Sequence, residues 1–358
     1  MLTSQCTQEP GLFTKSEIHS QPLCWVQSLH GLRADPEMEK ILREYSGRRR
    51  WVFIGCGSSY YLALAAAANW ETLTGLSAQA FPASELLLFP ELVLDKNSST
   101  QLVLISRSGT TSEVLRAAEL LQTRDIPFLG VTCTPGGALQ KLAAATLVPC
   151  AADEKSIVMT LSFTSMLLTL QYLAARMAGN EQFLHSLLDM AKRFEAVLDE
   201  ASAALKTFVS DHEFSDYVWL GQGLCYGLAC EGALKVSEMS CSFAQSYHTL
   251  EFRHGPKSIV RPDTLIMFQL SERGFDAERA VLEEVKELGG TTLVVTNEAD
   301  PRTQCAADLL VELGFASPEC AGLAARIVPA QLLGLYSGLQ KGFDPDSPRN
   351  LSRVVTLA

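Results

Sequence analysis

The chain contains an internal repeat, in which two segments match at an offset of 166 residues. The first segment reads VFIGCGSSYYLA from Val52, and the second reads VWLGQGLCYGLA from Val218. Each copy has the pattern of an apolar strand, a G-x-G turn and an alanine-rich helix. Further apolar runs follow both copies in the same order, at 102–109 and 127–133 and again at 264–271 and 291–297. The sequence therefore uses one structural unit twice.

The alternation of short apolar runs with longer helical stretches fixes the expected fold class. Such a pattern is typical of parallel strands that are covered on both faces by helices. We predict an α/β protein with two tandem domains, each a parallel sheet flanked by helices on both faces. The expected parts are a helical arm at 1–44, a first domain at 45–180, linking helices at 181–204, a second domain at 205–345 and a tail at 346–358. Trp25, within the arm, is expected to pack on the body of the protein.

Composition and charge exclude several classes of partner. The net charge of −11 repels nucleic acid and anionic lipid at long range, so neither is expected to bind. The start of the chain, MLTSQCTQEPGLFTKSE, lacks the apolar core of a signal peptide. The most apolar stretch, 157–175, is interrupted by serine, threonine and glutamine, which favours a buried helix over a membrane span.

The ten cysteines show no paired or metal-binding spacing. There is no C-x-x-C, and no histidine stands at zinc-ligand spacing beside any of them. Reduced structural thiols, a cytoplasmic location and no metal are therefore expected. The G-C-G of the first repeat lacks the third glycine of a dinucleotide fingerprint, so no nucleotide cofactor is expected either.

A hydroxyl-rich segment, SRSGTTSE from Ser106 to Glu113, joins an apolar run to a predicted helix. Free backbone N–H groups and the positive end of a helix dipole favour an anion at such a junction. A second hydroxyl pair, Ser58 and Ser59, follows the first strand and should lie on the same edge of the sheet. The alternative is a helix capped by Thr110, Thr111 or Ser112 beside surface serines.

Candidate acid and base groups lie in the second repeat. In EGALKVSEMS, Glu231, Lys235 and Glu238 are spaced by four and three residues, so they share one face of a helix. That face is either a solvated edge or the wall of a site. The following EFRHGP places His254 beside an acid and a cation, and histidine both donates and accepts protons near neutral pH. A purely structural histidine is the alternative.

Together these residues resemble the double sugar-isomerase (SIS) family, which includes the isomerase half of glucosamine-6-phosphate synthase and stand-alone amino-sugar-phosphate deaminases. The resemblance covers nearly the whole chain from about residue 45. Its markers, in order, are GCGSSYY at Gly55, PASEL at Pro82, SRSGTTSE at Ser106, EGALKVSE at Glu231, EFRHGP at Glu251 and DPDSPRNLSRVV at Asp344.

The resemblance implies a role for each matching residue. Glu238 falls on the glutamate that moves a proton between C1 and C2 of the opened sugar, and Lys235 falls on its neighbouring lysine. His254 falls on the ring-opening histidine, which in this family reaches across from the other subunit, so a homodimer with shared sites is implied. The residues expected to contact the phosphate or sugar are Ser58, Ser59, Ser106, Arg107, Ser108, Thr111, Thr160 and Arg353.

Three departures from the synthase direct the functional hypothesis. Cys6 is not amino-terminal and has no glutaminase domain around it, so ammonia from glutamine is not expected. Arg353 stands where the synthase has a lysine, and a guanidinium cannot form an imine. The segment IVMTLSFT, 157–164, is more like that of the stand-alone enzymes.

We therefore predict an amino-sugar-6-phosphate deaminase/isomerase that needs no cofactor and no glutamine. Two enzymatic alternatives stay open, an aldose/ketose phosphate isomerase and a fructosamine-6-phosphate deglycase. A non-catalytic sugar-phosphate sensor is the alternative from another class, because this fold also serves regulation.

Overall fold

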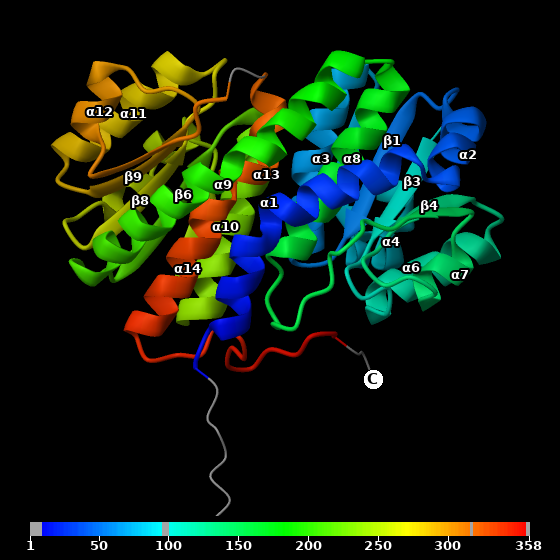
Figure 1. The fold of residues 1–358 in the computed structure, drawn as a ribbon, viewed down its shortest axis with the longest axis horizontal. Helices are drawn as coiled ribbons and strands as arrows, with labels where there is room; N and C mark the ends of the chain where they lie inside the picture. The colour runs from blue at the N-terminus through cyan, green and yellow to red at the C-terminus, as the bar shows by residue number, and fades with distance from the viewer. Residues whose placement is uncertain (1–8, 95–99, 316–317, 356–358) are drawn as a thin grey trace, which may run out of the picture.

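Two parallel five-stranded sheets form the framework of the computed structural model, which describes residues 9–94, 100–315 and 318–355. The first sheet has the order β2-β1-β3-β4-β5 and the second the order β10-β9-β8-β6-β7, so the two repeats have the same topology. The strands are β1 (Arg50–Gly55), β2 (Ser77–Pro82), β3 (Thr100–Ile105), β4 (Phe128–Val131), β5 (Ala145–Leu147), β6 (Asp216–Gly221), β7 (Ala244–Tyr247), β8 (Thr264–Gln269), β9 (Thr291–Thr296) and β10 (Leu309–Glu312). The predicted α/β class is confirmed (Figure 1).

Helices connect the strands and cover the sheets. The longer ones are α1 (Leu12–Arg33), α2 (Pro36–Tyr45), α3 (Ser58–Thr74), α6 (Ser112–Thr123), α8 (Leu161–Ala178), α9 (Glu181–Ser210), α10 (Tyr226–Ser240), α11 (Phe275–Glu287) and α14 (Val328–Gln340). The short ones are α4 (Ala83–Leu88), α5 (Pro90–Val93), α7 (Ala138–Leu142), α12 (Pro301–Ala306) and α13 (Leu323–Arg326), with 3-10 turns η1 (Gly223–Cys225), η2 (Glu251–Arg253), η3 (Pro256–Ile259) and η4 (Glu319–Gly322). None of the described helices is both long and apolar enough to cross a membrane.

Both faces of each sheet are buried, which explains the continuous apolar runs in the sequence. Successive side chains of a strand point to opposite faces. In β1, Trp51 and Phe53 belong to an inner apolar cluster, whereas Val52 and Ile54 belong to an outer cluster with residues of α4 and α6. The second sheet repeats this arrangement, with a separate outer cluster against α11 and α12.

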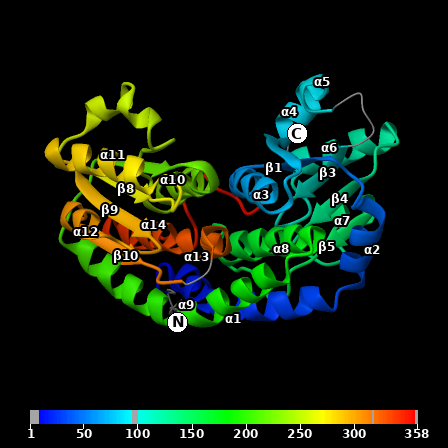
Figure 2. The same ribbon diagram turned by 90° about the horizontal axis from the view of Figure 1, so that it is seen from above.

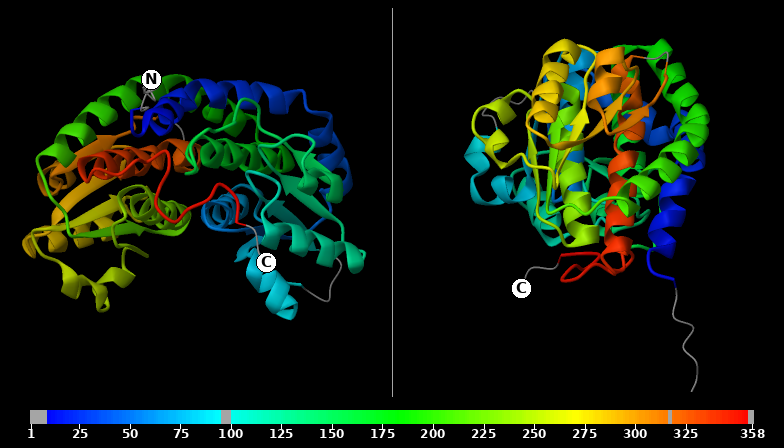
Figure 3. Two further views of the ribbon diagram at one scale, coloured as in Figure 1. Left: turned by 90° about the horizontal axis from the view of Figure 1, so that it is seen from below. Right: turned by 90° about the vertical axis from the view of Figure 1, so that its left-hand side faces the viewer.

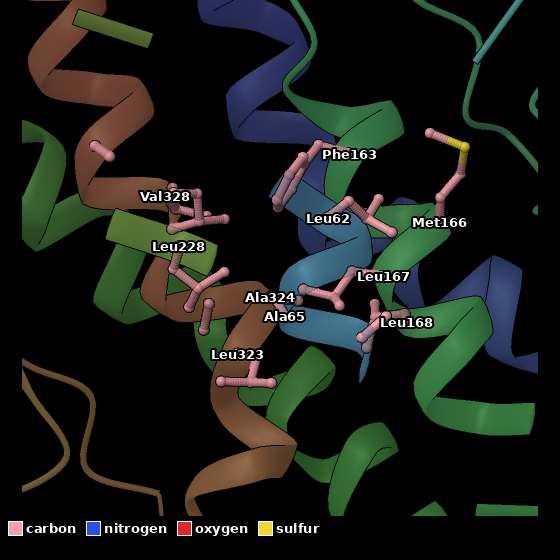
Figure 4. Close-up of a cluster of buried hydrophobic side chains, with 14 of the residues drawn as sticks. Leu62, Ala65, Phe163, Met166, Leu167, Leu168, Leu228, Leu323, Ala324 and Val328 are labelled. Carbon is pink, nitrogen blue, oxygen red and sulfur yellow. The ribbon is translucent and has the colours of Figure 1, made fainter. Parts of the chain in front are cut away.

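The inner cluster is shared by the two repeats, so they form one packed body. Figure 4 shows Leu62 and Ala65 of α3 between side chains of α8 and those of Leu228, Leu323 and Val328 from the second repeat. Helices α3 and α10 pack directly together where Gly227 lies: a Cβ atom there would stand 2.6 Å from the backbone nitrogen of Ala65. Glycine is required at this crossing because the neighbouring atoms belong to the backbone.

Two long helices run beneath both sheets, as Figure 2 shows for α1 and α9. The predicted packing of the arm is present in the structure: the Trp25 indole N–H donates to Thr164 Oγ1 at 2.9 Å, and its ring stacks on Phe194. A single helix of 30 residues, α9, occupies the stretch where several linking helices were expected. The first eight residues of the predicted arm, Cys6 among them, lie outside the described residues.

The carboxyl-terminal tail runs from the second repeat across the start of α1 to the first repeat (Figures 1 and 3). Two aspartates anchor its beginning. Asp344 Oδ1 accepts from the Gly11 N–H at 2.9 Å, and Asp346 accepts from the backbone N–H groups of Phe13 and Thr14 at 2.9 and 2.7 Å. These carboxylates satisfy free N–H groups at the start of α1. The last three residues of the predicted tail lie outside the described residues.

Candidate active site

The two hydroxyl-rich turns of the first repeat leave the same edge of the sheet. Strands β1 and β3 are parallel neighbours with Ile54 opposite Leu104, so the turns that follow them begin side by side. In the first turn, Gly57 has a positive φ of 54°, and α3 begins directly afterwards with Ser58 and Ser59. Both serines are buried, with 6 % and 5 % exposure.

The turn after β3 folds around the Ser106 hydroxyl. Its oxygen accepts from the Gly109 N–H at 3.1 Å and lies 3.1 Å from Thr111 Oγ1. Gly109 has a positive φ of 63°, which lets the chain turn back toward the start of α6. Thr111 is the N-cap of α6, but its side chain makes no capping hydrogen bond. The alternative interpretation, in which its hydroxyl caps the helix, therefore does not hold for Thr111. The hydroxyls therefore form a cluster at the start of the helix, together with Ser108, whose Oγ accepts from the Thr110 N–H at 3.2 Å.

The charged face of α10 is buried and is not a solvated edge. Glu231 and Lys235 are fully buried, and the side chain of Glu238 is 18 % exposed. Lys235 Nζ lies 3.2 Å from Glu231 Oε1 and makes a close ion pair with Glu238. It also donates to Ser58 Oγ at 3.1 Å, which joins the two repeats. Lys235 thereby links the Glu238 carboxylate to Ser58, at the first hydroxyl-rich turn of the first repeat.

Burial and charge set the protonation of this group. Burial raises the pKa of Glu231 to about 8, although the Lys235 ammonium opposes the shift. Burial alone would lower the pKa of Lys235, but the carboxylates of Glu231 and Glu238 more than offset it, and the pKa is raised. Burial therefore favours the protonated form of Glu231, and the neighbouring carboxyl groups favour the charged form of Lys235.

Three of the predicted substrate contacts are already engaged by other protein groups. Arg107 is 8 % exposed, and its guanidinium pairs with Glu154 Oε2 at 3.2 Å. Thr160 is fully buried, and both its N–H and its hydroxyl bond to Glu154 Oε1, at 2.7 and 3.2 Å. The Arg353 guanidinium faces outward to Asp153, 3.2 Å away. Among the described residues, these three side chains are therefore held by carboxylates of the protein itself.

His254 stands apart from the other predicted groups within the chain. It is the C-cap of η2, on an exposed loop after β7. Within the part of the chain that the structure describes, its imidazole has no hydrogen-bond partner. Figure 2 shows this loop projecting beyond the second sheet, while α4 and α5 project from the first on the same side. Ser58, Lys235 and Glu238 are thus brought together, the Ser106 turn follows the neighbouring strand, and His254 is placed elsewhere.

Glu154 is a residue of this region that sequence reasoning missed. It is 1 % exposed and also accepts from the Ser162 N–H at 2.9 Å. The sequence did contain a signal: Glu154 precedes Thr160 by six residues and Ser162 by eight, and these two hydroxyl residues stand at the start of an apolar helix. His248, to which no role is assigned from its sequence context, stacks on Tyr226 with ring centroids 3.7 Å apart.

Two parallel α/β units of the same topology meet where a buried charged group of the second contacts a hydroxyl-rich turn of the first. The family model of the SIS domain matches residues 44–176 and 217–333, which together exceed half of the chain. The protein belongs to the SIS domain family.

Two solved structures and one curated relative show where the chain lies within the family. Glucosamine-6-phosphate deaminase from Thermotoga maritima is 30 % identical with a TM-score of 0.79, and the match covers 96 % of this chain and 99 % of that one. Tagatose-6-phosphate ketose/aldose isomerase from Escherichia coli is 25 % identical with a TM-score of 0.83, covering 95 % and 97 %. Glutamine–fructose-6-phosphate aminotransferase from Pyrococcus horikoshii is 27 % identical over 96 % of this chain. The chain spans only 58 % of that relative's length.

Proposed function

We propose that this protein is an amino-sugar-6-phosphate deaminase/isomerase, which converts a hexosamine 6-phosphate and water into a ketose 6-phosphate and ammonia. The observation that carries the proposal is the Lys235–Ser58 hydrogen bond of 3.1 Å, which links the Lys235–Glu238 pair to the first hydroxyl-rich turn. The reaction as written uses water and no glutamine. The similarity to the Thermotoga maritima deaminase along nearly the whole chain supports the same choice.

In the proposed mechanism the phosphate binds at the Ser106–Thr111 turn and the start of α6, with help from Ser58 and Ser59. His254 opens the sugar ring by transferring a proton from the C1 hydroxyl to the ring oxygen. Glu238 removes the C2 proton while O1 takes up a proton, which gives an enolamine. Glu238 then returns its proton to C1 and the nitrogen releases one proton, which balances the one that O1 gained, so that an imine forms at C2. Water adds to this imine, and ammonia leaves from C2. No step needs an imine-forming lysine, which accommodates Arg353.

The fixed positive charge of Lys235 has a defined part in this scheme. Its ammonium stabilises the Glu238 carboxylate that must accept the C2 proton. The transferred proton is held close to the sugar because the carboxylate is mostly shielded from water.

A homodimer in which a second copy supplies His254 is part of the proposal. Three facts support it. The His254 loop is exposed, its imidazole has no recorded partner in the described chain, and Leu88, Phe89 and Leu92 on the projecting α4 and α5 are exposed apolar side chains, at 71 %, 47 % and 63 %. Apolar side chains gathered on one projection are typical of a protein interface. A cytoplasmic location also belongs to the proposal, and the free state of all nine described cysteines supports it.

The test is a panel of substrates offered to the purified protein: glucosamine, galactosamine, tagatose and fructosamine 6-phosphates. Ammonia, amino acid and ketose phosphate are measured separately. We expect equal amounts of ammonia and ketose phosphate from one of the two hexosamine phosphates. Mass measurement in solution, and restored activity when inactive Glu238→Gln and His254→Ala chains are mixed, test the shared site.

One alternative enzyme has specific support. The similarity to the Escherichia coli ketose/aldose isomerase is as extensive as that to the deaminase, so turnover of tagatose 6-phosphate without ammonia would replace the deaminase proposal. Release of an amino acid from fructosamine 6-phosphate would indicate a deglycase. Binding of a sugar phosphate without any turnover would indicate a sensor.

A further inference from the structure

Arg107 lies inside the predicted phosphate turn, yet its side chain leaves that turn. Its neighbours Ser106 and Ser108 belong to the hydroxyl cluster, whereas its guanidinium reaches a buried site on the other side. Nη1 donates to Glu154 Oε2 at 3.2 Å and to the carbonyl of Ile157 at 2.9 Å. The planar fork of arginine can serve such divergent acceptors, and lysine cannot.

Glu154 holds the guanidinium in place. The carboxylate is 1 % exposed and is itself fixed by the N–H groups of Thr160 and Ser162 at 2.7 and 2.9 Å. A buried cation paired with a carboxylate that has its other hydrogen bonds satisfied has one stable orientation. The position of the second nitrogen of Arg107 is therefore determined by the protein interior.

That second nitrogen binds the carboxyl-terminal tail. Arg107 Nη2 donates to the carbonyl of Arg353 at 3.0 Å. Two residues further on, the carbonyl of Val355 accepts from the Ser112 N–H of α6 at 3.3 Å. At its other end the tail is tied at Asp346, whose carbonyl accepts from the Ile157 N–H at 3.2 Å. The residues between, 349–353, are exposed, so these end contacts decide where the tail lies.

We propose that Arg107 is a positioning residue: held by Glu154, it fixes the tail against the hydroxyl turn and the start of α6, and it does not bind the phosphate itself. The tail is placed through a backbone carbonyl, so its position does not depend on the side chain at 353. The effect on the structure stands by itself, and only its effect on turnover rests on the proposed function.

The experiment uses the full chain with Arg107→Met and measures three quantities. We expect trypsin to cleave after Arg349 and Arg353 about tenfold faster than in the unaltered protein, because a bond from a charged donor no longer closes the tail. We expect the Kd for inorganic phosphate to change by less than about twofold, because the hydroxyl turn keeps its own donors. The KM for the sugar phosphate should rise more than kcat falls.

Two further variants make the result decisive. Arg107→Lys keeps the charge without the planar fork, and it should give a smaller rise in tail cleavage than Arg107→Met. It also provides the test if Arg107→Met folds poorly. Asp153→Ala removes only the exposed partner of the Arg353 side chain, and cleavage should stay within about twofold of the unaltered rate.

The proposal is overturned if both Arg107 variants leave the tail as resistant as before, or if they weaken inorganic phosphate binding as much as sugar-phosphate binding. The second result would make Arg107 a direct phosphate ligand. Faster tail cleavage in a protein that turns over no sugar phosphate would instead disprove the proposed function and leave the placement of the tail intact.

Discussion

Lys235 and Ser58 are 177 residues apart in sequence, and the lysine Nζ donates to the serine Oγ at 3.1 Å. One residue comes from the middle of α10, and the other begins α3 after the first G-x-G turn. This hydrogen bond joins the two repeats at the point where the acid–base group of one meets the hydroxyls of the other. The duplication therefore yields a candidate site that neither repeat contains by itself.

The role of Glu238 can be tested by removing its ability to accept a proton. Glu238→Gln keeps the shape of the side chain, and we expect kcat to fall by roughly 10²–10⁴-fold, the usual contribution of a positioned proton-transfer group. Steady-state kinetics on the substrate found in the panel measure this. Glu287→Gln, the same change at an exposed site on α11, serves as the control and should leave kcat unaltered. Ordinary turnover by Glu238→Gln would remove Glu238 from the mechanism.

Lys235→Met should destabilise the protein in a pH-dependent way. The change leaves two carboxylates, Glu231 and Glu238, beside each other without their cation, and removing one partner of a buried ion pair costs about 3–5 kcal/mol. The cost should be smaller at pH 6 than at pH 9, because in the unaltered protein the pKa of Glu231 is about 8 and its ionised form, which pairs with Lys235, predominates only at the higher pH. Urea unfolding at the two pH values measures it. The double variant Glu231→Gln/Lys235→Met should be less destabilised at pH 9 than Lys235→Met, and a strictly additive result would contradict this account.

The buried carboxyl group of Glu278 should make the free energy of unfolding depend on pH, independently of the candidate active site. Burial raises the pKa of this carboxyl to about 7, with hydrogen bonds from Ser271 opposing the shift. A raised pKa means that the folded protein holds the proton more tightly. The associated stability is thus complete below the ordinary value of 4.5 and is lost as pH rises through 7.

The variant Glu278→Gln should flatten this fall, which we expect to be roughly 3 kcal/mol between the two pH limits. Urea unfolding at half-unit intervals of pH measures the slope. Asp276→Asn, an exposed change on the same helix, should keep the slope of the unaltered protein. A slope that Glu278→Gln leaves unchanged would show that another group titrates.

The fold was predictable because the physics that produces it is local and repeated. The G-x-G turns at Gly55 and Gly221 mark strand-to-helix junctions, and the apolar runs match β3, β4, β8 and β9. The shared face of Glu231, Lys235 and Glu238 also follows from helical periodicity. Whether that face is solvated depends on what covers it, which spacing does not encode, and the contact of α10 with α3 decides it.

The remaining features depend on contacts between distant segments. The direction of Arg107 is set by Glu154, 47 residues away, and by a carbonyl 246 residues away. A residue that lies between two serines in a hydroxyl-rich turn looks like a phosphate ligand until those acceptors are known. His254 has a recognisable motif, but a sequence pattern within one chain does not show which groups its imidazole meets.

The crossing of α3 and α10 provides a last prediction, which links packing to the site. In Gly227→Ala the new Cβ would stand 2.6 Å from Ala65 N and 2.8 Å from Tyr61 O, and these backbone atoms can yield only if a helix moves. We expect a loss of about 1–3 kcal/mol in the free energy of unfolding. Because the same helices carry Lys235 and Ser58, turnover should fall as well. Gly47→Ala is the matched control, since a Cβ there meets nothing within 4 Å and its φ is not positive; it should be neutral or slightly stabilising. Equal stability and equal turnover for the two variants would mean that the repeats tolerate separation, and the close approach at Gly227 would then have no part in assembling the site.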